Sequence, residues 1–277
     1  MAARSHSGLW RWIAVGAGVA ICAAVLAGST TGSAAVGARL RVLQLNLCNS
    51  GIARCYTGHS VAKAAAVIRG VGPNLVTLNE VCREDVSKLE HVLAEGARDG
   101  GVASAFQPAG DRRTAAAFHC RNGQSYGIGL LARFPSLEDG YSIHAGIYPT
   151  QDTSDPEERA WLCLDTSDLV ACTTHLASTK PTVALAQCRY LFDTAIPALP
   201  RRGRAGPTVL GADLNLKPHH IPDVRYCLPS GYAQTYDGGT QYIVSSRDLR
   251  VSSASTIGMN RTTDHPGLLG TFTTLAD

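Results

Sequence analysis

The sequence predicts an α+β fold in which two β-sheets pack face to face as a sandwich flanked by helices. Short runs of Val, Leu and Ile bounded by turn residues recur along the chain, as expected of buried strands. Helical patterns lie between some of these runs without the strict alternation of a parallel β-α-β sheet. Hydrophobic residues make up 45% of the 277 residues, which is enough for one large core and favours a single domain.

Two strands and two helices are expected in the first part of the chain. Apolar runs indicate the strands, and apolar residues at helical spacing indicate the helices. In order, these elements are a strand at 41–47, a helix capped by Ser60 that ends before Pro73, a strand at 75–79 and a helix at 84–94. Residues 96–124 have no regular pattern and are expected to form an irregular connection.

Most of the remaining elements are expected to be strands. They are predicted at 126–132, 160–164, 169–174, 208–211, 241–245, 250–251 and 270–274. A helix at 181–197 is expected to turn Leu185, Cys188 and Leu191 inward. The segments 133–158 and 217–240 carry no readable pattern and are interpreted as specificity loops, so the leaving group of a substrate cannot be deduced.

Five apolar runs end in polar residues that suit phosphate chemistry. They are LQLN at 43–46, VTLNE at 76–80, TTHLA at 173–177, VLGADLN at 209–215 and TDH at 263–265. The last residue of a buried strand faces the rim of its sheet, where a carboxylate or imidazole is half-solvated and rigidly held. Phosphodiester hydrolysis needs a hard cation on oxygen ligands, a carboxylate that positions water, and donors for the phosphoryl charge. We therefore expect these segments to meet in one active site.

The metal-binding residues are expected to be Glu80, Asn46 and Asp264. Glu80 is the principal candidate, Asn46 would contact the metal or its water shell, and Asp264 would bind the metal or a water. Oxygen ligands at this density are typical of Mg²⁺ or Mn²⁺. The alternative for Glu80 is a carboxylate that caps the helix at 84–94.

The remaining motif residues are expected to handle the water and the phosphate. Asp213 would orient and deprotonate the attacking water, and Asn215, on the same side of an extended strand end, would donate to a phosphate oxygen. His265 would act as a second-sphere base or as a transition-state donor, and His175 would donate to the phosphate or the leaving oxygen. The alternatives are an Asx turn for Asp213 and Asn215 and a satisfied core histidine for His175.

From residue 41 to residue 272 these motifs resemble the endonuclease/exonuclease/phosphatase superfamily of DNase I-like, metal-dependent phosphodiesterases. The strongest pieces are GADLN, THL and the Asp-His pair. The resemblance implies a four-layer α/β/β/α fold and a divalent-metal-dependent hydrolase of phosphoric esters. It also implies that Tyr126 in YGIGLLAR brings a hydroxyl to the phosphate and that Arg159 in ERAW binds phosphate. An ordinary core or surface role is the alternative for each.

Two positions depart from the family pattern. Gln241 stands where the family has an aspartate that orients the catalytic histidine, and Ile128 stands where DNase I-like members have a glutamate that supports the other histidine. An amide can hold an imidazole in one tautomer, but it cannot stabilise the charged form as a carboxylate does. The chemistry is therefore expected to be slower or shifted in pH, unless Asp237 substitutes for the missing aspartate.

Residues 1–38 have the outline of a secretory signal. Arg4 and Arg11 precede an apolar stretch at 12–28, and small residues follow it. An apolar run of this length is at the lower limit for crossing a bilayer, so an uncleaved membrane anchor is the alternative. In either case, residues 39–277 are predicted to form the catalytic domain and to lie outside the cell.

Cysteine usage agrees with export. Cys22 lies in the predicted signal, and the other eight cysteines are an even number, as expected of disulfides in an exported chain. No Cys-x-x-Cys pair suggests a zinc site. The sequence does not determine the connectivity, and our working set takes local pairs first and the remaining cysteines by elimination: Cys48–Cys55, Cys163–Cys172, Cys82–Cys120 and Cys188–Cys227.

Charge limits the choice of substrate. Without Arg4 and Arg11 the chain has 23 basic and 22 acidic residues, so it lacks the net positive charge of a non-specific polyanion binder. A nucleic acid is nevertheless the first substrate that we expect for this secreted phosphodiesterase. We expect no stable protein partner and no membrane contact beyond an uncleaved amino-terminal segment.

Three alternative functions remain open. A sphingomyelinase would need an exposed aromatic hairpin, and aromatic residues are only 6% of the chain. An inositol-phosphate phosphatase would need more basic residues than Lys180 and Lys217 around its pocket. The third alternative, favoured by Gln241, is a binding protein that has kept the fold and lost the chemistry.

Overall fold

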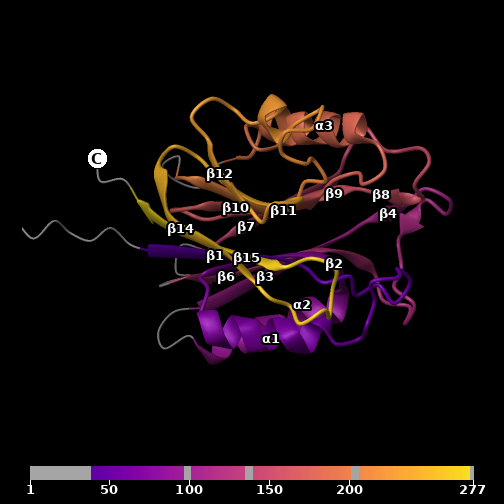
Figure 1. Ribbon diagram of the computed structural model, residues 1–277, viewed down its shortest axis with the longest axis horizontal. Helices are drawn as coiled ribbons and strands as arrows, with labels where there is room; N and C mark the ends of the chain where they lie inside the picture. The colour runs from indigo at the N-terminus through magenta and orange to yellow at the C-terminus, as the bar shows by residue number, and fades with distance from the viewer. Residues whose placement is uncertain (1–38, 97–100, 135–139, 201–205, 275–277) are drawn as a thin grey trace, which may run out of the picture. The chain divides into compact units, whose positions relative to one another are not determined.

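The computed structural model describes residues 39–96, 101–134, 140–200 and 206–274, so the predicted signal at 1–38 lies outside the described residues. The described residues belong to one compact unit. Within it, two six-stranded sheets pack face to face, with α1 and α2 outside one sheet and α3 outside the other (Figure 1). The predicted sandwich of two sheets flanked by helices is confirmed.

The first sheet has one parallel pair of strands, and this pair lies at its centre. Its order is β14 (Leu249–Ile257), β15 (Gly267–Thr274), β1 (Arg39–Asn46), β2 (Leu75–Cys82), β6 (Tyr126–Phe134) and β3 (Gly101–Pro108). Strands β1 and β2 run parallel, and the other neighbours are antiparallel. The carboxyl ends of β1 and β2 therefore lie at one edge of the sheet.

Helices α1 (Ser60–Val71) and α2 (Arg83–Glu95) cover the outer face of this sheet. Ala64, Val67 and Ile68 of α1 pack against the strands, and Gly72 ends the helix in the left-handed conformation before Pro73. The N-cap of α1 is His59, so Ser60 is the first helical residue instead of the predicted cap. Among the described residues, no helix is long and apolar enough to cross a bilayer.

The second sheet has the same plan. Its order is β12 (Ala233–Tyr236), β13 (Gln241–Ser245), β11 (Thr208–Asp213), β10 (Val170–His175), β9 (Ala160–Asp165) and β7 (Ser142–Ile147). Strands β10 and β11 are parallel, and the predicted strands β9 and β10 pair as an antiparallel hairpin. Helix α3 (Pro181–Tyr190), continued by a π-helical turn (Leu191–Ala195), covers the outer face with Ala184, Cys188 and Leu191 buried.

Three strands of the large sheets lie in segments predicted to be irregular, and each is at the edge of its sheet. They are β3, β7 and β12. An edge strand is paired on one side only, so less of its surface is buried and its apolar pattern is weaker. In β7, for example, Ile143 and Ile147 are exposed while the residues between them are small or polar. A small third sheet, formed by β5 (Ala116–Ala117), β4 (Gly110–Asp111) and β8 (Glu157–Glu158), lies in the same formerly unassigned segments.

All four expected disulfides are present. Cys163 and Cys172 are opposite one another in the β9–β10 register, and Cys188–Cys227 ties α3 to a 3₁₀ turn (Val224–Tyr226). Cys82–Cys120 joins the end of β2 to the segment before β6. Cys48–Cys55 closes the loop that follows β1, next to Asn46. This last bridge restrains the backbone beside the predicted site.

Candidate active site

The predicted site residues meet at one edge of the sandwich because of strand direction. The parallel strands β1, β2, β10 and β11 all run toward this edge and reach it at Asn46, Asn79, His175 and Asp213. The antiparallel neighbours begin at the same edge, since Tyr126 of β6 pairs with Cys82 and Gln241 of β13 pairs with Asp213. Residues separated by more than 200 positions in the sequence, such as Asn46 and Thr263, are thereby in contact, with the Thr263 hydroxyl donating to the Asn46 carbonyl at 3.0 Å.

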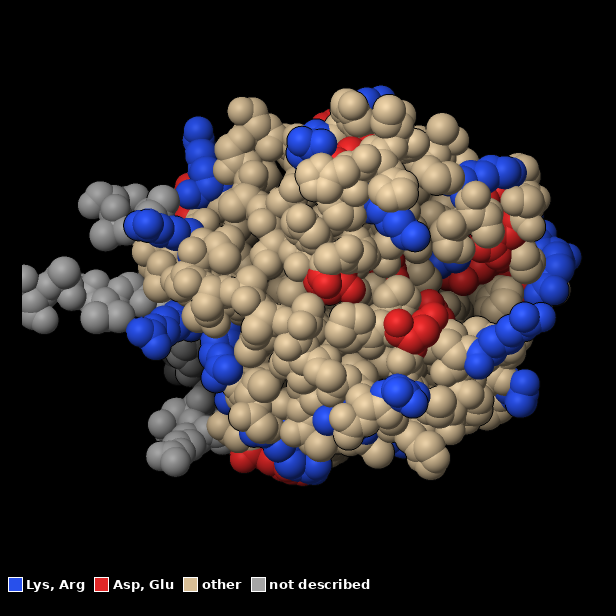
Figure 2. Space-filling view, in the orientation of Figure 1, with Lys and Arg blue, Asp and Glu red and all other residues tan. Residues whose placement is uncertain are grey.

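A cleft of about 400 Å³ opens at this edge. Figure 2 shows recessed acidic side chains near the right-hand edge of the view, with lysine and arginine side chains around them. Eight of the nine predicted site residues line the cleft: Glu80, Tyr126, Arg159, His175, Asp213, Asn215, Asp264 and His265. The ninth, Asn46, is buried and bonded to two of them.

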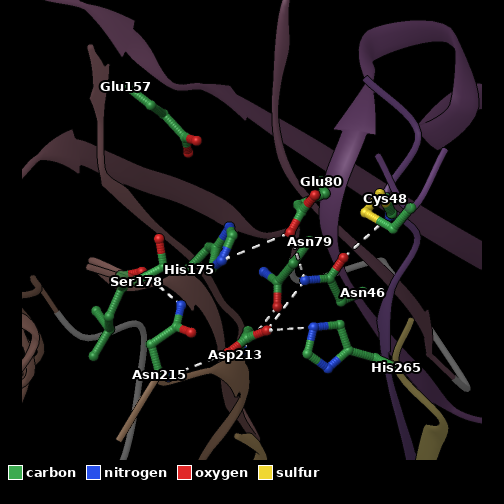
Figure 3. Close-up of polar contacts among 12 residues, drawn as sticks. Asn46, Cys48, Asn79, Glu80, Glu157, His175, Ser178, Asp213, Asn215 and His265 are labelled. Atoms are coloured by element: carbon green, nitrogen blue, oxygen red, sulfur yellow. Dashed lines mark hydrogen bonds and ion pairs between the residues drawn. A yellow bond between two sulfur atoms is a disulfide. The ribbon is translucent and has the colours of Figure 1, made fainter. Parts of the chain in front are cut away.

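Asn46 links the carboxylates of the two sheets (Figure 3). Its side-chain nitrogen donates to Glu80 Oε1 at 2.8 Å and to Asp213 Oδ2 at 3.1 Å, and its oxygen accepts from the Cys48 N–H at 3.1 Å. An acceptor-only carboxylate on each side explains why the nitrogen faces the cleft. Asn46 would bind a metal through its oxygen only if this amide turned over.

Glu80 is directed into the cleft by an irregularity in β2. Its φ is +55°, and the β2–β6 register shifts between Leu78 and Val81 at this point. The capping alternative does not hold, because Asp85 accepts from the Cys82 N–H at the start of α2. Glu80 is therefore available for a ligand.

The charge environment of Glu80 fits a hard divalent cation. Burial is the main cause that raises the pKa of Glu80, and the charges of Asp213 and Asp264 raise it further, while the Asn46 hydrogen bond and Arg159 lower it. Three carboxylates in a partly dry cleft repel one another, and a cation would relieve this repulsion. Glu80 and the half-exposed Asp264 supply the hard oxygen atoms that Mg²⁺ or Mn²⁺ prefers, with open space for water.

Asp213 and Asn215 combine the predicted site geometry with the alternative Asx turn. Asn215 has φ +49°, and its backbone N–H donates to Asp213 Oδ1 at 3.1 Å. The side-chain nitrogen of Asn215 donates to the Leu176 carbonyl at 2.9 Å and has a second hydrogen for a ligand in the cleft. The turn therefore holds the asparagine beside the carboxylate.

His175 is held by Arg159 instead of the glutamate that the family pattern would supply. Arg159 Nη1 lies 2.8 Å from His175 Nδ1, and Arg159 also contacts Asp155 and Glu157 at 3.1 Å each. Burial, and then the positive charge of Arg159, lower the pKa of His175 well below its usual value. Burial and the Arg159 charge therefore disfavour the imidazolium form of His175, and its other nitrogen, Nε2, lies 3.9 Å from Glu80 Oε1. Ile128 packs in the core between the sheets.

Gln241, which stands where the family has an aspartate, contacts both Asp213 and His265. Gln241 Nε2 lies 2.6 Å from Asp213 Oδ2 and 3.3 Å from His265 Nδ1. Asp237 accepts from the backbone N–H groups of Gly239 and Gln241, so it holds the β12–β13 turn. The suggested substitution of Asp237 for the family aspartate is not supported, since the glutamine itself contacts the histidine.

Glu157 is a cleft residue that the sequence did not reveal. It is largely buried beside Arg159, and the Tyr126 hydroxyl hydrogen-bonds to it. Burial raises the pKa of Glu157 to about 7; the charges of Glu80 and Asp155 also raise it, and Arg159 and Tyr126 lower it. The available signal was its position two residues before Arg159, on the same side of an extended segment.

We expect Glu157 to make the protein less stable as the pH rises from about 4.5 to about 7. Its carboxyl binds a proton more tightly when folded than when unfolded, so its stabilising contribution is complete below the unfolded pKa and is lost as the pH rises through the folded pKa. The difference between the folded and unfolded pKa values corresponds to a loss in the free energy of unfolding on the order of 3 kcal/mol. Urea unfolding of wild type and Glu157→Gln in EDTA at pH 5 and pH 7.5 measures it. An equal pH dependence in the two proteins would contradict this assignment.

Comparison with known proteins supports the fold. No protein-family model and no curated protein matches the sequence. Solved structures do match: an endonuclease/exonuclease/phosphatase from Beutenbergia cavernae DSM 12333 has a TM-score of 0.63 at 18% identity, over 85% of this chain and 72% of that chain. One from Bacteroides vulgatus has a TM-score of 0.60 at 13% identity, over 86% of this chain and 100% of that chain.

The catalytic domain of human Nocturnin also matches, with a TM-score of 0.60 at 17% identity, over 86% of this chain and 95% of that chain. This chain shares the fold of these proteins. At such identities the likeness concerns the fold alone, and function has to be argued from the residues of the cleft.

Proposed function

We propose that this chain is an exported, divalent-metal-dependent phosphoester hydrolase, with nucleic-acid phosphodiesters as its first candidate substrates. The observation that carries the proposal is the convergence of nine residues, chosen from sequence motifs, on one cleft edge. The likeness to solved structures adds support. The human Nocturnin structure contains a bound sulfate, and ANGEL2 is a 2',3'-cyclic phosphatase solved in complex with adenosine-2',3'-vanadate.

In the proposed reaction, Asp213 holds the attacking water and accepts its proton. The water oxygen bonds to phosphorus as the ester P–O bond breaks, and the leaving oxygen takes the bonding electrons and then a proton from solvent. Asn215, His175 and His265 contact the phosphoryl oxygens. A cation bound by Glu80 and Asp264 would neutralise charge that develops on the phosphoryl group.

The proposed export is supported by the cysteines. Four disulfides in the described residues are typical of a protein that folds in an oxidising environment. Activity should therefore be assayed on protein that has been secreted or refolded with its disulfides formed.

A substrate panel tests the proposed function. Plasmid DNA, RNA, adenosine 2',3'-cyclic phosphate, sphingomyelin and bis-p-nitrophenyl phosphate would each be incubated with the protein in Mg²⁺, Mn²⁺ or EDTA. We expect metal-dependent cleavage of a nucleic acid or of bis-p-nitrophenyl phosphate, and none in EDTA. Cleavage of sphingomyelin alone would reassign the substrate class, and no turnover of any substrate would favour the binding protein.

Replacing Glu80 is expected to abolish stabilisation by metal. A cation present at 100 times its Kd stabilises the folded state by about 2.7 kcal/mol. Glu80→Gln keeps the shape of the side chain and removes the charge that would hold the cation, so this stabilisation should largely disappear. Urea unfolding with and without Mg²⁺ measures it, and Glu84→Gln, on the exposed side of α2, is the matched control. Equal stabilisation of wild type and Glu80→Gln would place the metal elsewhere.

A further inference from the structure

A buried chain of side-chain amides joins the two sheets behind the cleft. The orientation of these amides is determined first at Asn79, which is fully buried and hydrogen-bonds to two backbone groups. Asn79 Oδ1 accepts from the Asp213 N–H at 2.8 Å, and Asn79 Nδ2 donates to the Thr174 carbonyl at 3.0 Å. A backbone N–H can only donate and a carbonyl can only accept, so the amide of Asn79 has one possible orientation.

Asn79 in turn orients Gln44. Because Asn79 Oδ1 is an acceptor, the group that faces it at 2.7 Å is Gln44 Nε2. The same nitrogen donates to Gln241 Oε1 at 2.9 Å, and the Thr77 hydroxyl donates to Gln44 Oε1 at 2.5 Å. Gln44 and Gln241 are also fully buried, so water does not compete for these positions.

Gln241 carries this orientation to the cleft. With its oxygen facing Gln44, its nitrogen faces Asp213 Oδ2 at 2.6 Å and His265 Nδ1 at 3.3 Å. The acceptor-only carboxylate of Asp213 favours the same orientation. An amide nitrogen does not accept hydrogen bonds, so Nδ1 of His265 must accept and a neutral His265 carries its proton on Nε2.

The second histidine has the same proton position for a different reason. A guanidinium has only donors, and Arg159 Nη1 faces His175 Nδ1 at 2.8 Å. Nδ1 of His175 must therefore accept, and its proton is on Nε2. The two imidazoles belong to opposite sides of the site, since His175 Nε2 is near Glu80 and His265 Nε2 is near Asp213 at 3.5 Å (Figure 3).

We propose that both histidines are held as Nε2–H tautomers and act as hydrogen-bond donors to the phosphoryl oxygens of the substrate. His265 is then a donor and not a base, and the proton of the attacking water goes to Asp213. Gln241 and Arg159 are positioning residues that act through the imidazoles. The donor role rests on the proposed function, whereas the proton positions belong to the resting protein.

Nitrogen NMR of the metal-free protein tests the proton positions without any assay of activity. Long-range ¹H–¹⁵N correlation spectra separate a protonated ring nitrogen from an unprotonated one, and the two histidines are identified by the signals missing from His175→Gln and His265→Gln. We expect the neutral form of both residues to have a protonated Nε2 and an unprotonated Nδ1. A neutral His265 with its proton on Nδ1 in the wild type would overturn the proposal.

Gln241→Glu tests the positioning role. The oxygen that replaces Nε2 presents a lone pair to His265 Nδ1 whether or not the new carboxyl is ionised, so His265 should gain a proton on Nδ1. His175 should be unchanged in the same spectrum, and Gln124→Glu, a partly exposed site whose oxygen accepts from the Glu84 N–H, is the matched control. If His265 kept an unprotonated Nδ1 in Gln241→Glu, Gln241 would not be its positioning residue.

Inorganic phosphate with Mg²⁺ tests the donor role. Binding should move the Nε2 protons of His175 and His265 downfield and leave those of His220 in place. The absence of a shift at saturating phosphate would refute the donor role. If the tautomers are as expected and no ester is hydrolysed, the proton positions stand and the proposed function fails. If the protein hydrolyses an ester but its His265 has the proton on Nδ1, the proposed function stands and the proposed tautomer is wrong.

Discussion

His265→Ala is expected to lower the turnover number about 10²-fold to 10³-fold, the usual range for losing one hydrogen-bond donor to charge that develops in the transition state. The side chain of His265 is 24% exposed at the rim of the cleft, and its nearest acidic atoms are Asp213 Oδ2 and Asp264 Oδ1. Its removal opens no cavity in the core, so the folded protein should remain. The measurement is the initial rate on the substrate identified in the panel, at saturating metal.

Two further variants make this expectation specific. His220→Ala removes an exposed histidine of the loop after β11 and should keep full activity. His265→Gln places an amide N–H near the position of Nε2, so a donor role predicts more activity than in His265→Ala, whereas a base role predicts equal losses. A His265→Ala protein with wild-type turnover would remove this residue from the reaction.

The site could be predicted from sequence because its signals are local. Four of the five motifs lie at or near the end of a buried strand, whereas TDH lies in the loop before β15. A strand that ends in His175 or Asp213 shows this in its own few residues. The motifs do not show which strands pair with one another. Two parallel pairs of strands are nevertheless enough to bring the strand ends to one edge. The fold class followed from the same apolar runs.

The remainder depends on contacts between distant segments. Asn79 sits inside the motif VTLNE, but its role comes from partners in β1 and in the second sheet. Arg159 was expected to bind phosphate, and the structure shows that its charge also faces Asp155, Glu157 and His175. Edge strands were missed for another reason, because strands paired on one side carry a weaker apolar pattern.

Asn79→Ala is expected to reduce the free energy of unfolding by about 4 kcal/mol, the largest change in stability that we predict. The substitution leaves the Asp213 N–H, the Thr174 carbonyl and a hydrogen of Gln44 without their partner in a dry interior. Each such group costs about 1 to 3 kcal/mol, and partial relaxation reduces the sum. Urea unfolding of the oxidised protein measures it. Asn122→Ala, at an exposed turn with one local hydrogen bond, should cost less than about 1 kcal/mol.

Asn79→Ala should also change the orientation of side chains in the cleft. This effect distinguishes a connected hydrogen-bond network from a set of independent hydrogen bonds. Asn79 is the only one of the three amides whose orientation is fixed by backbone groups among the described residues, so without it Gln44 and Gln241 can turn over together. Gln241 would then present its oxygen to Asp213, and His265 would lose its donor at Nδ1. We therefore expect the folded fraction of Asn79→Ala to turn over substrate more slowly than wild type, although Asn79 does not line the cleft. Unchanged turnover per folded molecule, with the expected loss of stability, would mean that Asp213 alone orients Gln241.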